Sequence, residues 1–422
     1  MTDRNQNRPG YKKTKAGWIP EEWKSSRFDE VSIVNPKRSM KLPACISFVG
    51  MADVSECGVI QNQTVKQVKD GINGFTPFIE NDILVAKITP CFENYKGAMA
   101  VGLVNGVGFG STEFHVIRPL DIDRNFIFYH TRTHRFRVSG VSNMVGSAGQ
   151  KRVPAEFIQK YIIPLPPLPE QKQITEILST WDEAIEQTRQ LIAAANRRKK
   201  ALMQKLLTGK KRLKGFKGKW TSKRLSVITE RITSITEHPE NYPVLSITAG
   251  TGFVSQADKF SRVIAGKHIE NYVLLKRGEF SYNKGNSYRY PQGCVYQLHE
   301  YNEGLVPDVF YSFRLNPAFA HDGFIKQFFI AGLHNRKLYR CVNTGVRNNG
   351  LLNLNADDFF SLEIKLPNLD EQRIIAAVLQ TADEEIAVLE SKLAALEKQK
   401  RGLMQKLLTG EVRLIFGTET IQ

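Results

Sequence analysis

Apolar side chains recur at alternating spacings of four and three residues in two long stretches, 165–213 and 366–414. This spacing keeps one apolar seam on the same side of an α-helix, where it faces a partner helix, and is typical of a coiled coil. We therefore predict two long helices that form a coiled-coil interface. The interface positions are Ile174, Leu178, Trp181, Ile185 and Ile192 in the first stretch and Ile375, Leu379, Ile386, Leu389 and Leu393 in the second.

The two stretches are copies of one another. The first opens with LPPLPEQ and the second with LPNLDEQ, and both reach LMQKLLTG at a constant offset of 201 residues. A period of this length indicates a duplicated domain plus helix rather than a solenoid repeat. A duplicated unit favours a pseudo-two-fold arrangement with antiparallel helices. The alternative is that each helix packs only on its own domain, which the length of the seam disfavours.

Lysines interrupt the seam at Lys199 and Lys400, the same position in both copies. A lysine at a seam position lowers stability and can fix the register of the helices. It can also extend its charged end to solvent while the stem covers apolar surface. Both interpretations stay open at this point.

Short apolar runs separated by Gly, Asn and Pro occupy the remainder of the chain and predict strands and turns. The two globular parts align faintly at an offset of 197, where Trp23 matches Trp220 and Lys87 matches Lys284. We predict an α+β fold in which two β-rich mixed domains are separated by two long antiparallel coiled-coil helices. The predicted boundaries are 1–164 for the first domain, 165–213 for its helix, 214–365 for the second domain, 366–414 for its helix and 415–422 for a tail.

The composition of the chain favours an anionic binding partner. The formal net charge is +17, and such an excess favours nucleic acid, although a basic surface can also serve solubility alone. No apolar run reaches the ~18 residues that span a membrane, and the N-terminus lacks an apolar leader segment. Five scattered cysteines indicate neither a disulfide framework nor a zinc site. A cytoplasmic protein without membrane contact is expected.

Motifs for catalysis are weak. The segment 316–319 resembles a methyltransferase tetrapeptide, but the glycines of 106–110 lie far away in a β-rich domain, so a turn at the end of a strand explains Asn316 better. Asp308 with Glu363 only imitates a nuclease site, because Mg²⁺ sites need clustered carboxylates. His130 and His134 lack the glutamate of a zinc-protease helix, and a surface helix is the expected context. No phosphate-binding loop for ATP is present.

Candidate DNA contacts are polar and basic residues of the predicted loops, because lysine and arginine contact phosphates while Arg, Asn, Gln and Ser read bases. The two sets come from glycine-flanked loops at corresponding places in the two domains. They are Lys87, Tyr95, Lys96, Asn143, Ser147, Gln150, Lys151 and Arg152 in the first domain and Lys284, Asn286, Tyr288, Arg289, Arg347, Asn348 and Asn349 in the second. For any single residue, a solvated loop is an equally good interpretation. Since the loops differ, two half-sites of different sequence are expected, held apart by the helices.

The paired helices, together with the opening GWIPEEW at Gly17–Trp23, closely resemble the specificity subunits of Type I restriction-modification systems. The resemblance covers essentially the whole chain and is weakest in the loops. It implies two target-recognition domains that read a bipartite DNA site, a coiled coil that sets the gap, and no catalytic activity in this chain.

The implied partners are double-stranded DNA, two adenine methyltransferase subunits that dock on the helices, and two restriction/translocase subunits. S-adenosylmethionine, ATP and Mg²⁺ would belong to those subunits. The alternative from another class is a basic scaffold that binds an acidic protein, or a toxin-like or antiviral assembly, without base-specific readout.

Overall fold

The computed structural model describes residues 5–37, 42–68, 72–147, 149–260, 266–285, 290–341, 352 and 354–414. The chain divides into two compact units. Unit 1 contains residues 1–187 and 393–422, and unit 2 contains residues 188–392. Each unit is therefore made of a globular domain and one part of each long helix, α5 (Leu168–Leu206) and α11 (Leu369–Leu408).

Unit 1 contains two four-stranded sheets. The first is antiparallel throughout, with the order β4-β11-β8-β9: β4 (Ser32–Val34), β11 (Phe114–Pro119), β8 (Ile83–Ala86) and β9 (Gly97–Met99). The second has the order β6-β5-β10-β7: β6 (Thr64–Gln67), β5 (Cys45–Val49), β10 (Val107–Gly110) and β7 (Thr76–Ile79). Strands β5 and β10 are parallel. All four residues of β8 are buried, which accounts for its unbroken apolar sequence.

Two of the glycines of 106–110, Gly108 and Gly110, serve packing in this second sheet. A Cβ on Gly108 would lie 2.1 Å from the Phe78 ring, and one on Gly110 would lie 2.3 Å from the carbonyl oxygen of Val49. Glycine is therefore required so that the neighbouring side chain and strand can approach closely. Residues 107–110 thus belong to strand β10.

Further short elements complete unit 1. The hairpin β1 (Tyr11–Thr14) and β2 (Gly17–Pro20) precedes β3 (Lys24–Arg27), which pairs with β12 (Ile162–Leu165). The helices are α1 (Phe28–Val31), α2 (Arg124–Thr131), α3 (His134–Ser142) and α4 (Ala155–Lys160).

Unit 2 repeats the antiparallel framework. Its four-stranded sheet has the order β14-β21-β18-β19: β14 (Thr229–Ile232), β21 (Tyr311–Leu315), β18 (Phe280–Asn283) and β19 (Cys294–Gln297). Since β8 and β18 occupy the same place in their sheets, the faint alignment of the two domains is confirmed. Three strand pairs accompany this sheet: β15 (Leu245–Thr248) with β16 (Gly252–Ser255), β17 (Val273–Lys276) with β20 (Glu303–Val306), and β13 (Thr221–Arg224) with β22 (Glu363–Leu366).

The helices of unit 2 are α6 (Leu225–Ile228), α7 (Gln256–Phe260), α8 (Asp322–Ile330), α9 (Asn335–Cys341) and α10 (Ala356–Phe360). Between β21 and α8 lies the tetrapeptide that imitates a methyltransferase motif. Its Asn316 side chain accepts a hydrogen bond from the Ala318 N–H at 3.0 Å, and the Phe319 N–H donates to the Asn316 carbonyl at 3.1 Å. The predicted turn at the end of a strand is confirmed.

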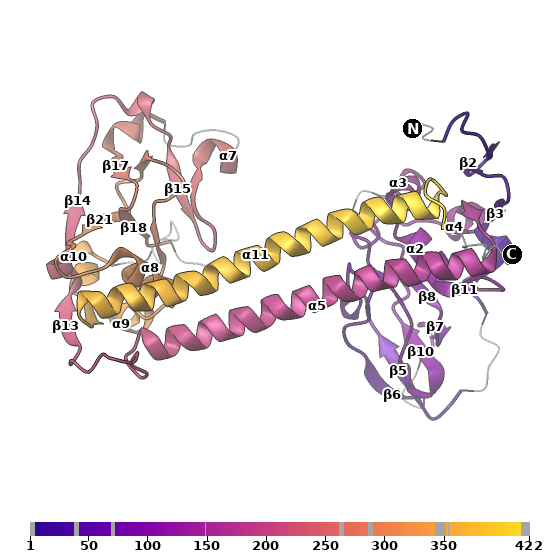
Figure 1. Cartoon of the computed structure of the whole chain (residues 1–422), viewed down its shortest axis with the longest axis horizontal. Helices are drawn as coiled ribbons and strands as arrows, with labels where there is room; N and C mark the ends of the chain where they lie inside the picture. The colour runs from indigo at the N-terminus through magenta and orange to yellow at the C-terminus, as the bar shows by residue number, and fades with distance from the viewer. Residues whose placement is uncertain are drawn as a thin grey trace, which may run out of the picture. The chain divides into compact units, whose positions relative to one another are not determined.

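Helices α5 and α11 lie side by side and run in opposite directions within each unit (Figure 1). The predicted α+β class with long antiparallel helices is confirmed. Each helix end also enters a domain core, which the coiled-coil prediction did not include. In unit 1, Ile174 of α5 and Leu407 of α11 share one cluster with Trp23 and Phe28. In unit 2, Leu206 and Ile375 share a cluster with Phe313 and Phe324.

A glycine with positive φ follows each helix: Gly209 at φ +70° and Gly410 at φ +70°. Glycine adopts this left-handed conformation, which ends an α-helix, at less cost than a residue with a Cβ. In the described parts of the chain, no helix has both the length and the apolar composition that a membrane span needs.

Candidate nucleic-acid interface

Two loops of unit 1 meet beyond the end of β8. The Val153 N–H donates to the Lys87 carbonyl at 2.8 Å, and the Thr89 N–H donates to the Lys151 carbonyl at 2.9 Å. Val145 and Arg152 also form an isolated antiparallel bridge. The structure thus brings together Lys87 and the loop 145–152, which carries the predicted contacts Ser147, Gln150, Lys151 and Arg152.

Within this loop three of the candidate side chains are exposed, and the fourth binds another residue of the fold. Ser147, Gln150 and Lys151 are exposed. Arg152, in contrast, forms a bidentate ion pair with Glu113, from Nε at 3.0 Å and from Nη2 at 2.8 Å. The hydrogen bond from Arg152 lowers the pKa of the Glu113 carboxyl, although burial opposes this effect. Arg152 therefore shapes the loop, and Lys151 is better placed to contact a ligand.

The other candidates of unit 1 lie around α3. Asn143 is exposed and donates to the Ser139 carbonyl at 2.8 Å, closing the end of the helix. Lys96 donates to the Met51 carbonyl at 3.1 Å. Tyr95 has a positive φ of 59° and lies 3.5 Å from the His134 ring through its hydroxyl. These contacts assign Lys96 and Tyr95 to holding the loop 90–96.

Two arginines outside the predicted set, Arg132 and Arg137, also support the loop 90–96. Arg137 lies 4.5 Å from the centre of the Phe92 ring and 5.0 Å from that of Tyr95, and it donates to the Phe92 carbonyl at 3.1 Å. Burial, with the nearby charge of Arg132, lowers the pKa of Arg137 to about 9. Arg132 donates to the Tyr95 carbonyl at 2.9 Å and to the Glu56 carbonyl. Burial lowers the pKa of Arg132 as well.

A surface helix was expected for both histidines, and the surface position is wrong for His130, which lies on a helix but is buried. His130 and His134 belong to different helices, α2 and α3, because α2 ends at its C-cap Arg132 and α3 begins after its N-cap Thr133. His130 is 4% exposed and its ring packs against Phe126. The apolar residues of α2 face the core on the same side as His130, a point that spacing to His134 could not reveal.

In unit 2 the corresponding position is Lys284, directly after β18. The Leu352 N–H donates to the Lys284 carbonyl at 2.9 Å, as Val153 does to Lys87 in unit 1. The Lys284 ammonium lies 3.1 Å from the Tyr311 hydroxyl. The remaining candidates lie outside the described residues: Asn286, Tyr288, Arg289, Arg347, Asn348 and Asn349.

Buried ion pairs hold the ends of α5 and α11 on each domain. In unit 1, Arg413 donates to Glu170 from Nε at 2.8 Å, and Trp23 Nε1 donates to the same carboxylate at 2.9 Å. In unit 2, Arg212 donates to Glu371 from Nε at 2.7 Å and from Nη2 at 2.6 Å. Glu170 and Glu371 are both almost fully buried. We call these two arrangements the helix clamps.

The seam lysines also form ion pairs across the helices. Lys199 pairs with Asp383 in unit 2, and Lys400 pairs with Asp182 at 2.5 Å in unit 1. Burial lowers the pKa of Lys400, and Asp182 opposes that shift. Because each lysine meets an aspartate on the facing helix, the register interpretation explains the seam lysines better than extension into solvent does.

The interface positions predicted for the coiled coil differ in burial. Ile174, Leu178, Ile185, Ile375, Leu379 and Ile386 are buried, whereas Trp181, Ile192, Leu389 and Leu393 are half-buried.

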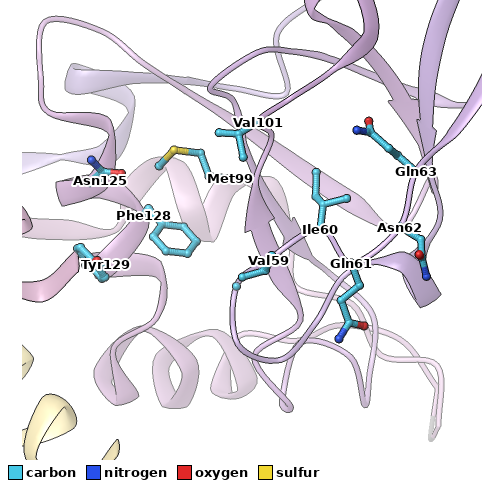
Figure 2. Close-up of a pocket in the computed structure, with 11 residues that line it drawn as sticks. Val59, Ile60, Gln61, Asn62, Gln63, Met99, Val101, Asn125, Phe128 and Tyr129 are labelled. Atoms are coloured by element: carbon cyan, nitrogen blue, oxygen red, sulfur yellow. The ribbon is translucent and has the colours of Figure 1, made fainter. Parts of the chain in front are cut away.

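A cavity of about 320 Å³ lies in unit 1 between α2 and residues 58–63 (Figure 2). Phe128 and Tyr129 of α2 face Val59, Ile60 and the end of β9 across it. Tyr129 is the only ionisable residue in its lining, and its hydroxyl donates to Asp182 at 2.9 Å. Burial is the main cause that raises the pKa of Tyr129. These lining groups do not form an acid-base pair. Among the described residues, no three His, Cys, Asp or Glu side chains gather as a possible metal site.

Comparison with known protein families identifies the class of this chain. Residues 20–197 and 313–398 match the model of the Type I restriction modification DNA specificity domain. These two ranges make up more than half of the chain, which therefore belongs to this family.

Individual relatives agree with this membership. The Type I restriction enzyme EcoAI specificity subunit of Escherichia coli is 39% identical over 178 residues, which are 40% of this chain but only 30% of that subunit. The chain thus spans less than a third of that relative. The putative type I restriction enzyme MjaX specificity subunit of Methanocaldococcus jannaschii is 24% identical, across 96% of this chain and 97% of that protein.

A solved chain from work on complex assembly and conformational transition of the type I R-M system is similar in fold. It is 17% identical, with a TM-score of 0.57, over 93% of this chain and 99% of that one. At this identity the likeness concerns the fold alone.

Proposed function

We propose that this chain is the DNA-reading specificity subunit of a Type I restriction-modification complex, and that it recognises a bipartite, asymmetric site. The observation that carries the proposal is the pair of equivalent loop positions. In the first domain the Val153 N–H donates to the Lys87 carbonyl, and in the second the Leu352 N–H donates to the carbonyl of the equivalent Lys284. The sequences of the two candidate loops differ. Two similar frameworks whose loop sequences carry different polar residues suit two half-sites of different sequence.

In this proposal the chain binds DNA and directs chemistry that other subunits perform. Two methyltransferase subunits would dock on the helices and methylate adenine, and two restriction/translocase subunits would complete the complex. S-adenosylmethionine, ATP and Mg²⁺ would bind in those subunits. The length of the paired helices would set the gap between the half-sites, as half-site spacing follows protein geometry in other two-part DNA readers.

The test is methylome sequencing of a host that carries this chain with its methyltransferase partner, compared with the same host without the chain. A split adenine-methylation motif that depends on the chain is expected. Methylation without a motif, or sequence-independent binding at physiological salt, would instead favour the basic scaffold.

Single substitutions then test whether the domains read separately. Lys151→Ala should relax or abolish recognition in one half of the motif, and Arg347→Ala should do so in the other half. Changes of equal size in both halves after either substitution would contradict separable domains.

A further inference from the structure

The second half of α5 and the segment that follows it concentrate much of the net positive charge of the chain. From Thr188 to Thr229 the sequence contains fourteen lysines and arginines and neither aspartate nor glutamate, against a formal net charge of +17 for the whole chain. Residues 210–219 of this stretch, between α5 and β13, carry five lysines that we call the lysine loop: Lys210, Lys211, Lys214, Lys217 and Lys219. All five are exposed.

The lysine loop is held in a defined shape by the helix clamp of unit 2. Arg212 donates to the Gly218 carbonyl at 2.7 Å from Nη1 while its other nitrogens bind Glu371. The Lys211 N–H donates to the Lys205 carbonyl at 3.1 Å, and the Phe216 N–H donates to the Leu213 carbonyl at 3.2 Å. Arg212 and backbone hydrogen bonds therefore hold the loop, and the five lysine side chains take no part in these contacts.

The charge of the lysine loop is also not required by the repeated architecture. At the equivalent positions of the second helix copy, Glu411 replaces Lys210 and Val412 replaces Lys211. At the equivalent of Lys219 in the first domain stands Glu22, which binds Arg413 at 2.7 Å. None of the five lysines forms a salt bridge within the part of the chain that the structure describes. Like charges so close together destabilise the fold unless an external anion neutralises them.

The chemistry of this surface fits a phosphate backbone better than a protein. Protein interfaces contain a buried core of aromatic and other apolar side chains. Here Leu213 and Phe216 are half-buried, and the exposed residues of 208–219 are lysines, a threonine and glycines. Lysine contacts phosphate as a point charge and carries no base preference of its own.

We propose that the lysine loop is a sequence-independent contact surface for the backbone of duplex DNA, additional to the base-reading loops. It rests on the proposed function, because it assigns a further contact with the same ligand. Neutralising phosphates releases counterions, so the loop should steepen the salt dependence of binding without altering the methylated motif.

The experiment uses the full chain assembled with its methyltransferase partner, and a short labelled duplex of arbitrary sequence as the probe. The five lysines are replaced together by glutamine, and a matched variant replaces them by arginine to keep the charge. Binding is measured over a potassium chloride series. The glutamine variant should reduce the slope of log K against log salt by about 2 to 4, at ~0.9 for each phosphate that the loop no longer neutralises. The arginine variant should keep the slope.

An unchanged slope in the glutamine variant would overturn the inference. Failure of that variant to assemble with the methyltransferase, while the arginine variant assembles, would overturn it in favour of an acidic protein partner. Circular dichroism and thermal unfolding of both variants separate these outcomes from misfolding. A methylome without a split motif would refute the proposed function instead, whereas a motif that persists with an unchanged slope would refute only the lysine loop.

Discussion

Units 1 and 2 hold their helices with equivalent charged residues, but the residues around these ion pairs differ. Glu170 and Glu371 are equivalent at the offset of 201, as are Arg212 and Arg413. Around Glu170, Trp23 donates a second hydrogen bond to the carboxylate and Glu22 binds the same arginine. In unit 2, Trp220 Nε1 is buried and finds no hydrogen-bond partner among the described residues.

The shared part has a physical cause in the crossed arrangement of the repeats. Each clamp joins the beginning of one helix copy to the residues after the end of the other, as Glu170 joins Arg413. The seam pairs follow the same rule, with Asp182 on one copy and Lys400 on the other. Every copy must therefore supply both the carboxylates and the cations, which explains why the copies agree at these positions. Domain residues, which are not part of either helix copy, are free to differ, as Glu22 and its equivalent Lys219 do.

Removal of the clamp arginines should produce the largest effects and separate the two units. Arg413→Ala leaves the Glu170 carboxylate, 3% exposed, without its cation, at a cost of about 3 kcal/mol. The loss should be greater for Arg212→Ala, because Glu371 has no tryptophan donor to replace Trp23. Chemical denaturation measures the stability.

Hydrogen exchange then locates the damage from each substitution. Exchange should rise around Trp23 after Arg413→Ala and around Trp220 after Arg212→Ala. Arg413→Lys is the charge-retaining control. Faster exchange in both units after either substitution would show that the clamps do not act separately.

Each unit also buries a histidine, and acid should destabilise both. Burial lowers the pKa of His334 to about 4, and burial together with Arg135 lowers that of His130 to about 3. Since the unfolded chain titrates near ~6.5, it binds more protons than the folded chain as pH falls below that value. Stability should therefore fall between pH ~6.5 and ~4, by roughly 2 kcal/mol for each histidine at pH ~5.

The measurement is the free energy of unfolding at pH 7 and pH 5 for the protein and for His130→Phe and His334→Phe. Each variant should lose about half of the pH dependence in this window, and the double variant should lose most of it. An undiminished pH dependence in the double variant would assign the effect to other groups, of which His115 is the first to test because burial lowers its pKa too.

The sequence predicted the parts of this molecule that depend on periodicity. The seam from Ile174 to Leu393 and the strand framework around Lys87 and Lys284 follow from local spacing. The partners of Lys199 and Lys400 do not, because they depend on the register of two helices about 200 residues apart in sequence.

The candidate site was less accessible to prediction for the same reason. From the sequence, Arg152 and Lys151 were equally good candidates for a DNA contact. Only the fold shows that Arg152 lies beside Glu113. Arg137 was not among the predicted site residues, and only the fold shows it buried against Phe92 and Tyr95. Loop chemistry depends on contacts that are distant in sequence, and no local pattern contains them.

The smallest expected effect concerns the two tryptophans, and it tests the difference between the clamps most directly. Trp23→Phe removes the hydrogen bond to Glu170, and a bond to a charged group contributes about 1.5 to 3 kcal/mol. Trp220→Phe removes a buried N–H that has no described partner, and this gain offsets part of the cost of weaker packing. Denaturant unfolding should therefore show Trp23→Phe to be the more destabilising by about 1.5 kcal/mol.

Combining Trp23→Phe with Arg413→Ala should give a cost different from the sum of the two, because both act on one carboxylate. Equal costs for the two tryptophans would mean that the Trp23 hydrogen bond does not distinguish the clamps and that packing alone sets their strength.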